Sequence, residues 1–303
     1  MLEPVHLRDL TVDPATHPRG QPHLSAASGL ALAGPWLYLV SDDEQHIGIL
    51  EAAGQPATPV ELHRVLQGAL PRDKGGRKKL KPDLEALALL PAMADHPHGA
   101  LLGLGSGSRR NRQRGWGVRL DSGGRPAGAA GAIELAGWYG PLHAAFQDLN
   151  IEGAFVAGDR FHLLQRANKG SQANASIAFS LAQLHDWLAG RRAAPPLPLH
   201  IQQFELGSTD GVPYGITDGA ALPDGGWVFS AVAEDTADSY NDGACAGSAI
   251  GRVGSDGHLR RLQPLAGAPK VEGIALCGKC LLMVTDSDDP GVASQLLTVE
   301  LDP

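Results

Sequence analysis

The chain has 303 residues, with 39 glycines, 22 prolines, a hydrophobic fraction of 43% and a formal net charge of −8. This acidic balance argues against a general nucleic-acid-binding protein. No run approaches the roughly 18 unbroken apolar residues that a membrane-spanning helix requires. Glycine and proline make up about a fifth of the residues, which favours many turns and short strands over long helices.

The first residues, MLEPVHLRDLTVD, lack the basic and apolar regions of a secretory signal. We therefore expect a cytoplasmic protein, although a chain trimmed of its leader would start in the same way. Residues 5–12, VHLRDLTV, form the first predicted strand.

Five segments of the chain share one pattern: a polar or acidic head residue, then Gly or Ala, a short apolar strand, a turn and a second apolar strand. The heads are Ser28, Glu85, Glu152, Asp218 and Glu272, at intervals of 57, 67, 66 and 54 residues. Such a period, with several strands in each unit, is typical of a β-propeller. We therefore predict an all-β protein with one propeller domain over residues 1–303.

Further strands are predicted after each repeated hairpin. In chain order they cover residues 46–52, 59–66, 115–121, 131–137, 175–181, 197–206, 248–254, 259–265 and 295–301, with a helical insertion near residues 180–192. The fifth unit lacks a fourth strand, and residues 5–12 would supply it by pairing with that blade. This closure removes the two free sheet edges. The result is five four-stranded blades; a sixth blade within 111–148 or 180–210 is the alternative.

Small residues follow the head on one side of each first strand. Side chains alternate across a strand, so Gly273 and Ala275 share one face, while Ile274 and Leu276 share the other. Blades crowd together near a propeller axis, and we expect the small face to pack there.

The three cysteines cannot form a disulfide framework. Two of them, Cys277 and Cys280, occupy the same slot as residues 33–36 and 157–160, a tight turn where glycine relieves the backbone. A zinc site would need a second pair of ligands, and Cys245 is isolated. A redox site would place the pair at a helix N-terminus. We interpret both cysteines as turn residues.

In a propeller the innermost strands line the central channel, so the five heads are expected to form a ring. Like charges this close raise one another's pKa unless cations or hydrogen bonds offset them. Two interpretations stay open. The carboxylates accept backbone N–H bonds from the next blade, or some of them coordinate a hard cation such as Ca²⁺.

A second polar ring is predicted where the second strand of each unit ends, with acidic and basic sectors. Such a mouth could hold a metal on one side and an anionic group on the other. Solvated loop charges in weak salt bridges are the alternative. The candidate metal ligands in the two rings are Asp42, Glu85, Glu152, Asp218, Glu272 and Asp286. The candidate substrate-binding residues are Ser28, Arg109, Arg166, Asn168, Lys169 and Glu234.

Other motifs are weak. The basic run SGSRRNRQRGWG, residues 106–117, is more typical of a loop than of a nucleic-acid site in an acidic protein. It lacks the Gly-Lys-Ser/Thr ending of a P-loop, and neither His-Glu-x-x-His nor Gly-x-Ser-x-Gly occurs. We expect no nucleotide, haem or flavin, and neither nucleic acid nor membrane as a partner.

The heads DLEAL, NIEGA and KVEGIAL, together with YLVSDDEQ and LLMVTDSDD, resemble the phytase-like propeller proteins, a group labelled "esterase-like activity of phytase". The resemblance spans nearly the whole chain. It implies a propeller and a metal-dependent phosphoester hydrolase, with the carry-over limited to Glu85, Glu152 and Glu272. Ser28 and Asp218 depart from the pattern.

Three functions follow as hypotheses. The first is a hydrolase of a small anionic ester, in which carboxylates such as Glu152 and Glu272 hold Ca²⁺ or another divalent ion. In this hypothesis Arg109 and Arg166 bind the anion. The second is a non-catalytic propeller that binds a ligand or a protein partner. The third is a sugar-lactonase-like enzyme, against which the serine at position 28 counts, since such an enzyme is expected to offer a metal-binding glutamate there.

Overall fold

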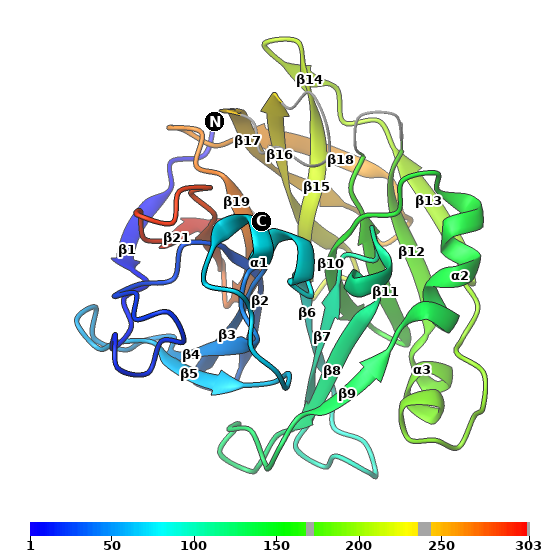
Figure 1. Ribbon diagram of the computed structural model, residues 1–303. Helices are drawn as coiled ribbons and strands as arrows, with labels where there is room; N and C mark the ends of the chain where they lie inside the picture. Colours follow the sequence, from blue (N-terminus) through cyan, green and yellow to red (C-terminus); the bar gives the residue numbers. More distant parts are fainter. Residues whose placement is uncertain (168–172, 236–243, 302–303) are drawn as a thin grey trace.

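Five antiparallel sheets surround a common centre in this computed structural model, which confirms the predicted five-bladed propeller (Figure 1). The structure describes residues 1–167, 173–235 and 244–301. The predicted substrate-binding residues Asn168 and Lys169 lie outside the described residues.

Each blade runs outward from its first strand. Blade 1 contains β2 (Ala27–Ala33), β3 (Trp36–Ser41), β4 (His46–Glu51) and β5 (Glu61–Arg64). Blade 2 contains β6 (Leu84–Leu90), β7 (Ala100–Gly105), β8 (Arg114–Arg119) and β9 (Gly131–Glu134). Blade 3 contains β10 (Ile151–Ala157), β11 (Arg160–Gln165), β12 (Asn174–Ser180) and β13 (His200–Phe204).

Blade 4 departs from the predicted four strands. It contains β15 (Val212–Ala221), β16 (Trp227–Asp235), β17 (Ala244–Val253) and β18 (Leu259–Pro264). A two-residue strand, β14 (Ser208–Thr209), pairs with the start of β15 and makes the sheet five-stranded.

Blade 5 joins the two ends of the chain. It contains β19 (Val271–Cys277), β20 (Cys280–Thr285), β21 (Gln295–Glu300) and β1 (Val5–Asp9). In the antiparallel pairing of β1 with β21, Val5 lies opposite Thr298 and Asp9 lies opposite Gln295. The predicted closure by the N-terminal strand is confirmed.

Three α-helices lie between or within the blades: α1 (Lys74–Leu80), α2 (Ala136–Ala145) and α3 (Leu181–Leu188). Helix α3 lies within the predicted insertion and begins after Ser180, whose Oγ accepts a hydrogen bond from the Gln183 N–H. The other two were not predicted, because α1 has no apolar period and α2 contains a proline and two glycines. Within the described chain, residues 111–148 and 180–210 contribute to these blades and helices and form no sixth sheet. No helix of the described chain is long and apolar enough to cross a membrane.

A β-bulge marks the head of every blade. The pairing between the first two strands shifts register at Ala27/Leu30, Leu84/Ala86, Ile151/Gly153, Ile216/Gly219 and Val271/Gly273. Bulges bend a strand and redirect a side chain out of the regular alternation. The repeated head motif therefore marks a repeated backbone irregularity, the β-bulge, as well as a repeated side-chain pattern.

Small residues after the heads let the innermost strands approach one another. A Cβ added at Gly153 would lie 2.7 Å from the Cα of Asp218, and one added at Gly29 would lie 2.6 Å from the Leu87 nitrogen. In both cases the obstacle is the backbone of the next blade. The expected small face near the axis is thus confirmed at these positions.

The two cysteines of blade 5 are turn residues, as predicted. Cys277 ends β19 and pairs with Cys280 at the start of β20, while Gly278 adopts a φ of 61° between them. Both are free cysteines.

We expect Gly153→Ala to destabilise the fold by about 2 kcal/mol or more, since the new methyl group must push two blade backbones apart. Gly131→Ala in β9 is the matched control, because an added Cβ there meets nothing nearer than 3.9 Å. Urea unfolding curves of the two variants measure the difference. Equal stabilities would contradict the close-approach argument.

Candidate functional site

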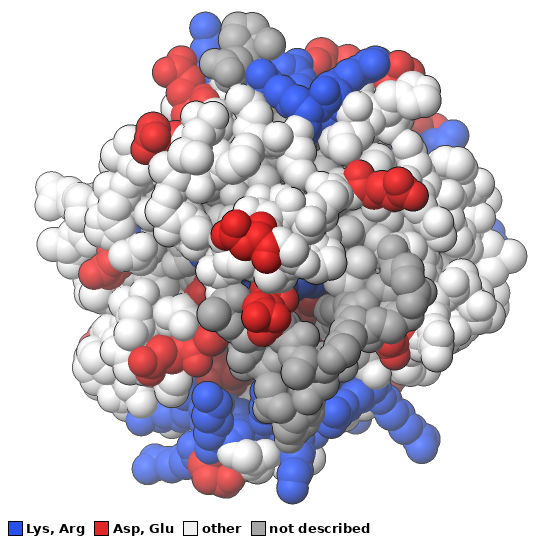
Figure 2. All heavy atoms as spheres, turned by 90° about the horizontal axis from the view of Figure 1, so that it is seen from above, with Lys and Arg blue, Asp and Glu red and all other residues white. Residues whose placement is uncertain are grey.

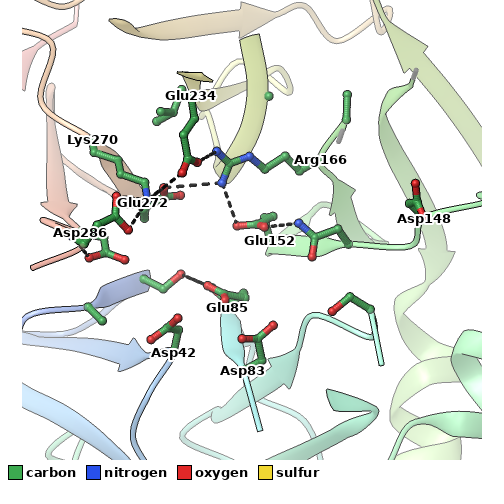
Figure 3. A pocket seen from close by; sticks show the side chains of 18 of the residues that line it. Asp42, Asp83, Glu85, Asp148, Glu152, Arg166, Glu234, Lys270, Glu272 and Asp286 are labelled. Carbon is green, nitrogen blue, oxygen red and sulfur yellow. Dashed lines mark hydrogen bonds and ion pairs between the residues drawn. The ribbon is translucent and has the colours of Figure 1, made fainter. Parts of the chain in front are cut away.

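A cavity of about 850 Å³ opens at one end of the propeller, and residues from all five blades line it (Figure 3). Helix α1 also contributes to the lining. In a view turned by 90° from Figure 1, Lys and Arg side chains gather mainly along the upper and lower edges, the two ends of the propeller (Figure 2). The cavity itself is more acidic, with twelve Asp or Glu residues against eight Lys or Arg residues.

The two predicted rings meet in this cavity. Of the heads, Ser28, Glu85, Glu152 and Glu272 line it. Of the residues at the ends of the second strands, Asp42, Arg166, Glu234 and Asp286 line it. The fold therefore brings together residues that lie up to 258 positions apart in the chain.

A third set of lining residues was missed by the sequence analysis. Asp83, Asn150 and Lys270 each precede a head by two positions and line the same cavity. Residues i and i+2 point to the same side of an extended chain. The sequences DLE, NIE and KVE carried this signal, because their polar residues repeat at the same distance from the head.

Three carboxylates form one cluster, which we call the acidic triad: Asp42, Asp83 and Glu85. One oxygen from each residue lies within 4.8 Å of the other two. Asp42 directly follows β3, whereas Asp83 and Glu85 lie at the start of β6, so the triad spans the junction of blades 1 and 2.

Hydrogen bonds and ion pairs orient the triad. The Ser28 hydroxyl donates to Glu85 Oε2 at 2.8 Å. Asp83 accepts from the Ser106 hydroxyl at 2.6 Å and lies 2.7 Å from Arg112 Nη1. These contacts fix the carboxylates without neutralising all of them.

The pKa values of two triad residues, Asp42 and Glu85, are raised, so their charged forms are disfavoured in this environment. Burial raises the pKa of Asp42 to about 6, even though Lys81 opposes the shift. Burial, followed by the charges of Glu152, Asp83 and Asp42, raises the pKa of Glu85 well above its usual value. The triad would therefore be stabilised by additional positive charge.

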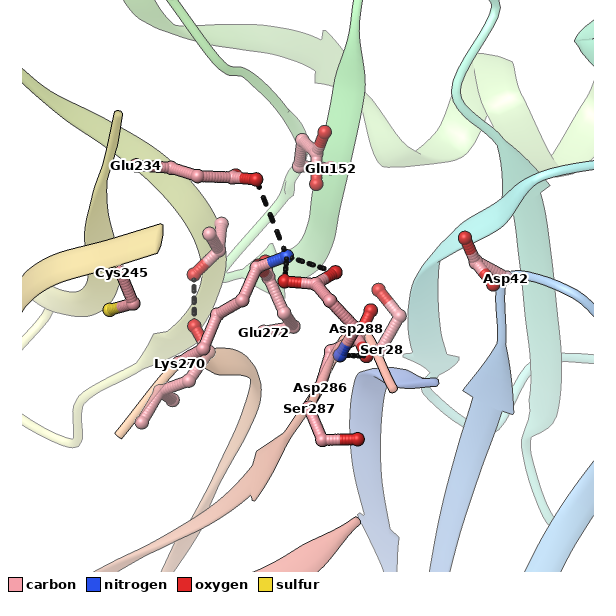
Figure 4. Close-up of polar contacts among 12 residues, drawn as sticks. Ser28, Asp42, Glu152, Glu234, Cys245, Lys270, Glu272, Asp286, Ser287 and Asp288 are labelled. Carbon is pink, nitrogen blue, oxygen red and sulfur yellow. Dashed lines mark hydrogen bonds and ion pairs between the residues drawn. The ribbon is translucent and has the colours of Figure 1, made fainter. Parts of the chain in front are cut away.

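On the other side of the cavity, two cations are held among four carboxylates. Arg166 Nη2 lies 2.8 Å from Glu234 Oε2, and its Nη1 lies 3.6 Å from both Glu152 Oε2 and Glu272 Oε1. Lys270 Nζ lies 2.6 Å from Asp288 Oδ2 and 3.7 Å from Glu234 and Glu272 (Figure 4). The charge of Arg166 is thus shared among three glutamates. Neither Lys270 nor Asp288 was predicted as a site residue.

Two of these glutamates have features typical of functional groups. The second oxygen of Glu272, Oε2, has no hydrogen-bond partner among the described residues. This oxygen is buried, and the whole side chain is only 6% exposed. Burial raises the pKa of Glu152 to about 7, while Arg166 opposes the shift. Glu152 also accepts a hydrogen bond from the Asn150 amide. A carboxylate that titrates near neutral pH suits proton transfer.

Asp218 lies apart from the other heads. It is fully buried and does not line the cavity. Its Oδ2 accepts backbone N–H bonds from Ile274 at 2.9 Å and Leu30 at 3.3 Å, and its Oδ1 accepts from Gly219 at 2.8 Å. At this one head the structure favours the interpretation in which a carboxylate joins neighbouring blades.

The basic loop of blade 2 contributes two arginines to the cavity. Arg109 lies on the cavity wall with an exposed side chain. Arg112, which was not selected as a site residue, is buried and reaches Asp83. The short 3₁₀ helix Arg110–Arg112 turns the chain between them.

Comparison with protein families gives one match: Family of unknown function (DUF6929), over residues 23–301. The chain belongs to this family. Comparison with curated proteins finds no match.

Several solved structures align with this chain at low sequence identity. Glutaminyl cyclase from Myxococcus xanthus aligns with a TM-score of 0.51 and 8% identity, covering 100% of this chain and 99% of that one. The PQQ-bound aldose sugar dehydrogenase from Streptomyces coelicolor gives 0.46 and 15%, covering 98% and 97%. A gluconolactonase from Xanthomonas campestris gives 0.40 and 12%, covering 91% and 87%. Of these three, the glutaminyl cyclase has a TM-score above 0.5, and at 8% identity it supports the fold alone.

The raised pKa of Glu152 predicts a pH dependence of stability. Between pH 4.5 and about 7 the folded protein keeps a proton on Glu152 that the unfolded chain has released, so this group makes stability fall as pH rises through that window. Each unit of the pKa shift corresponds to about 1.4 kcal/mol. We expect Glu152→Gln to lose less stability than the wild type between pH 5 and pH 8, as measured by urea unfolding.

Glu205→Gln is the matched control for this experiment, because Glu205 is exposed on the outer wall of the same cavity. It should retain the wild-type dependence. A Glu152→Gln variant that does the same would contradict the burial argument.

Proposed function

We propose that the protein binds a divalent cation at the acidic triad and hydrolyses a small anionic ester in the cavity. The observation that carries the proposal is the convergence of Asp42, Asp83 and Glu85, whose oxygens lie within 4.8 Å of one another at the base of a large polar cavity. Three carboxylates in this arrangement are a ligand set for Ca²⁺, Mg²⁺ or Mn²⁺.

The donor set fits a hard cation. All three groups offer oxygen, and burial raises the pKa of Asp42 and Glu85, so positive charge would stabilise both. The buried, unpartnered Oε2 of Glu272 lines the same cavity and offers a further acceptor to whatever binds there. Two cations oppose the fit: Lys81 already contacts Asp42 and must move to admit the ion, and Arg112 lies 2.7 Å from Asp83.

The acidic excess of the cavity explains why an anionic substrate would need the cation. Twelve carboxylates line the cavity, and the charge of Arg166 is already shared among three of them. A bound divalent ion would neutralise charge and lower the pKa of a coordinated water. Arg166 and Lys270 would orient the anionic group, and Glu152 would accept the proton released in hydrolysis.

The resemblance of the head motifs to phytase-like propellers supports the same reaction class. Membership of that group is itself a prediction. The sugar-lactonase-like alternative has less support, because Ser28 donates a hydrogen bond to Glu85 where a metal-binding glutamate would be expected.

We expect the wild-type protein to bind one divalent ion, and Asp42→Asn, Asp83→Asn and Glu85→Gln each to weaken binding at least about tenfold. Loss of one carboxylate removes both a ligand and a charge. Titration calorimetry with Ca²⁺ and Mn²⁺ measures the affinities. Asp148→Asn is the control, since Asp148 lines the outer wall and is exposed. A loss of affinity of the same size in that control would contradict the triad as the binding site.

Hydrolysis is tested on a panel of phosphoesters and lactones with and without added Ca²⁺ or Mn²⁺. We expect cation-dependent turnover of at least one anionic ester, and a fall in kcat of roughly 100-fold or more in Glu152→Gln, because removing a general base typically costs 10²–10⁴. Substrate binding should persist in that variant. An absence of turnover on every substrate would contradict the proposed hydrolase activity. It would not contradict the proposed cation site.

A second candidate is a non-catalytic propeller that binds a ligand or a protein partner. It is favoured by the ion pairs that occupy Arg166 and Lys270, because such pairs stabilise a rigid recognition surface. Under this alternative the cavity would bind its ligand with no turnover and with the same affinity in Glu152→Gln.

A further inference from the structure

Lys81 places a cation of the chain itself inside the acidic triad. Its ammonium contacts Asp42 Oδ2 and lies 3.0 Å from Asp83 Oδ1, and its side chain is only 11% exposed. These are oxygens of the same two carboxylates that, with Glu85, form the triad. The triad therefore already binds a positive charge, and the chain supplies it.

This ammonium stays charged throughout the physiological pH range. Burial alone would lower the pKa of Lys81, but the charges of Asp42, Asp83 and Glu85 together raise it well above its usual value. The raised pKa opposes release of Lys81 by deprotonation, whereas a cation that competes for the same oxygens would displace it.

Lys81 is also the residue that ends helix α1. Its backbone N–H donates to the Arg77 carbonyl at 2.7 Å and closes the last turn of the helix. Pro82 follows, and Asp83 then adopts a left-handed φ of 56°. The ammonium, the end of the helix and one triad carboxylate lie within three residues, so movement of one strains the others.

Helix α1 is short and depends on a few contacts besides this one. It has seven residues, of which Gly75 and Gly76 disfavour a helix, and Leu80 is 62% exposed. The buried Arg77 lies 3.3 Å from Asp43, and Asn111 donates to the carbonyls of Lys79 and Lys81. A seven-residue helix with two glycines depends on such contacts, since it is not stable by itself.

We propose that Lys81 is a built-in competitor of the divalent cation, so that an ion entering the acidic triad displaces the ammonium and releases helix α1 from the cavity mouth. This inference rests on the proposed cation site. An ion and an ammonium that share the same oxygens would lie within about 4 Å of each other, where like charges repel by several kcal/mol at an intermediate dielectric. Their binding is therefore mutually exclusive, and Lys81 sets the affinity of the site.

The test compares cation affinity in the wild type, Lys81→Met and Lys79→Met. Lys79 has the same charge and belongs to the same helix, but its side chain is exposed and does not line the cavity. By titration calorimetry with Ca²⁺ and Mn²⁺, we expect Lys81→Met to bind at least about tenfold more tightly than the wild type. Lys79→Met should stay within about twofold of the wild type.

A second readout follows helix α1 itself. The amides of Arg77 and Lys81 bond to the carbonyls of Asp73 and Arg77, so their hydrogen–deuterium exchange reports whether the helix is formed. We expect Ca²⁺ to accelerate their exchange in the wild type. In Lys81→Met the exchange should be fast with and without the ion. Should Lys81→Met fail to fold, as judged by circular dichroism, Lys81→Gln takes its place.

The outcomes separate this inference from the proposed function. Equal affinities of Lys81→Met and the wild type, with unchanged exchange in α1, would overturn the competition while the cation site stands. No cation binding in any variant would overturn both. Tighter binding in both lysine variants would assign the effect to overall charge and would also overturn the inference.

Discussion

The structure depends on the close approach of five innermost strands at the propeller axis, and the buried carboxylate of Asp218 is central to it. That one side chain accepts backbone N–H bonds from blade 1 at Leu30, from blade 5 at Ile274 and from its own strand at Gly219. Backbone donors at the end of a crowded ladder would otherwise lack partners, which is costly when they are buried. Glycines beside the heads make the approach possible.

The same geometry explains why four heads line a cavity and one does not. All five interrupt their strands with a bulge, so all five are turned out of the sheet. Asp218 is the exception, because both of its carboxylate oxygens accept backbone N–H bonds. The side chains of Ser28, Glu85, Glu152 and Glu272 line the cavity. The result is an acidic cavity lined by four heads, while the fifth head hydrogen-bonds to the backbone of the innermost strands.

The propeller, its closure and nine of the polar residues that line the cavity could be predicted from the sequence, because repeated units place equivalent residues at equivalent levels. Asp83 and Lys270 follow the same logic two positions before the heads and could have been found. Lys81 could not, because it ends a short helix between blades 1 and 2, where no period relates it to the repeat. Arg112 lies in the loop between β7 and β8 of blade 2. Those two cations decide how the triad is compensated.

The pairing of β1 with β21 has a consequence for biosynthesis. Residues 5–9 are synthesised before blades 1 to 4, whereas their partners at residues 295–300 are synthesised after those blades. Because domains begin to fold during synthesis, blades 1 to 4 can form while only the outer strand β1 of blade 5 has been made. Until then the ring stays open and the N-terminal strand is an unpaired edge. The cavity needs Glu272 beside Arg166, so it cannot be complete until blade 5 has been synthesised.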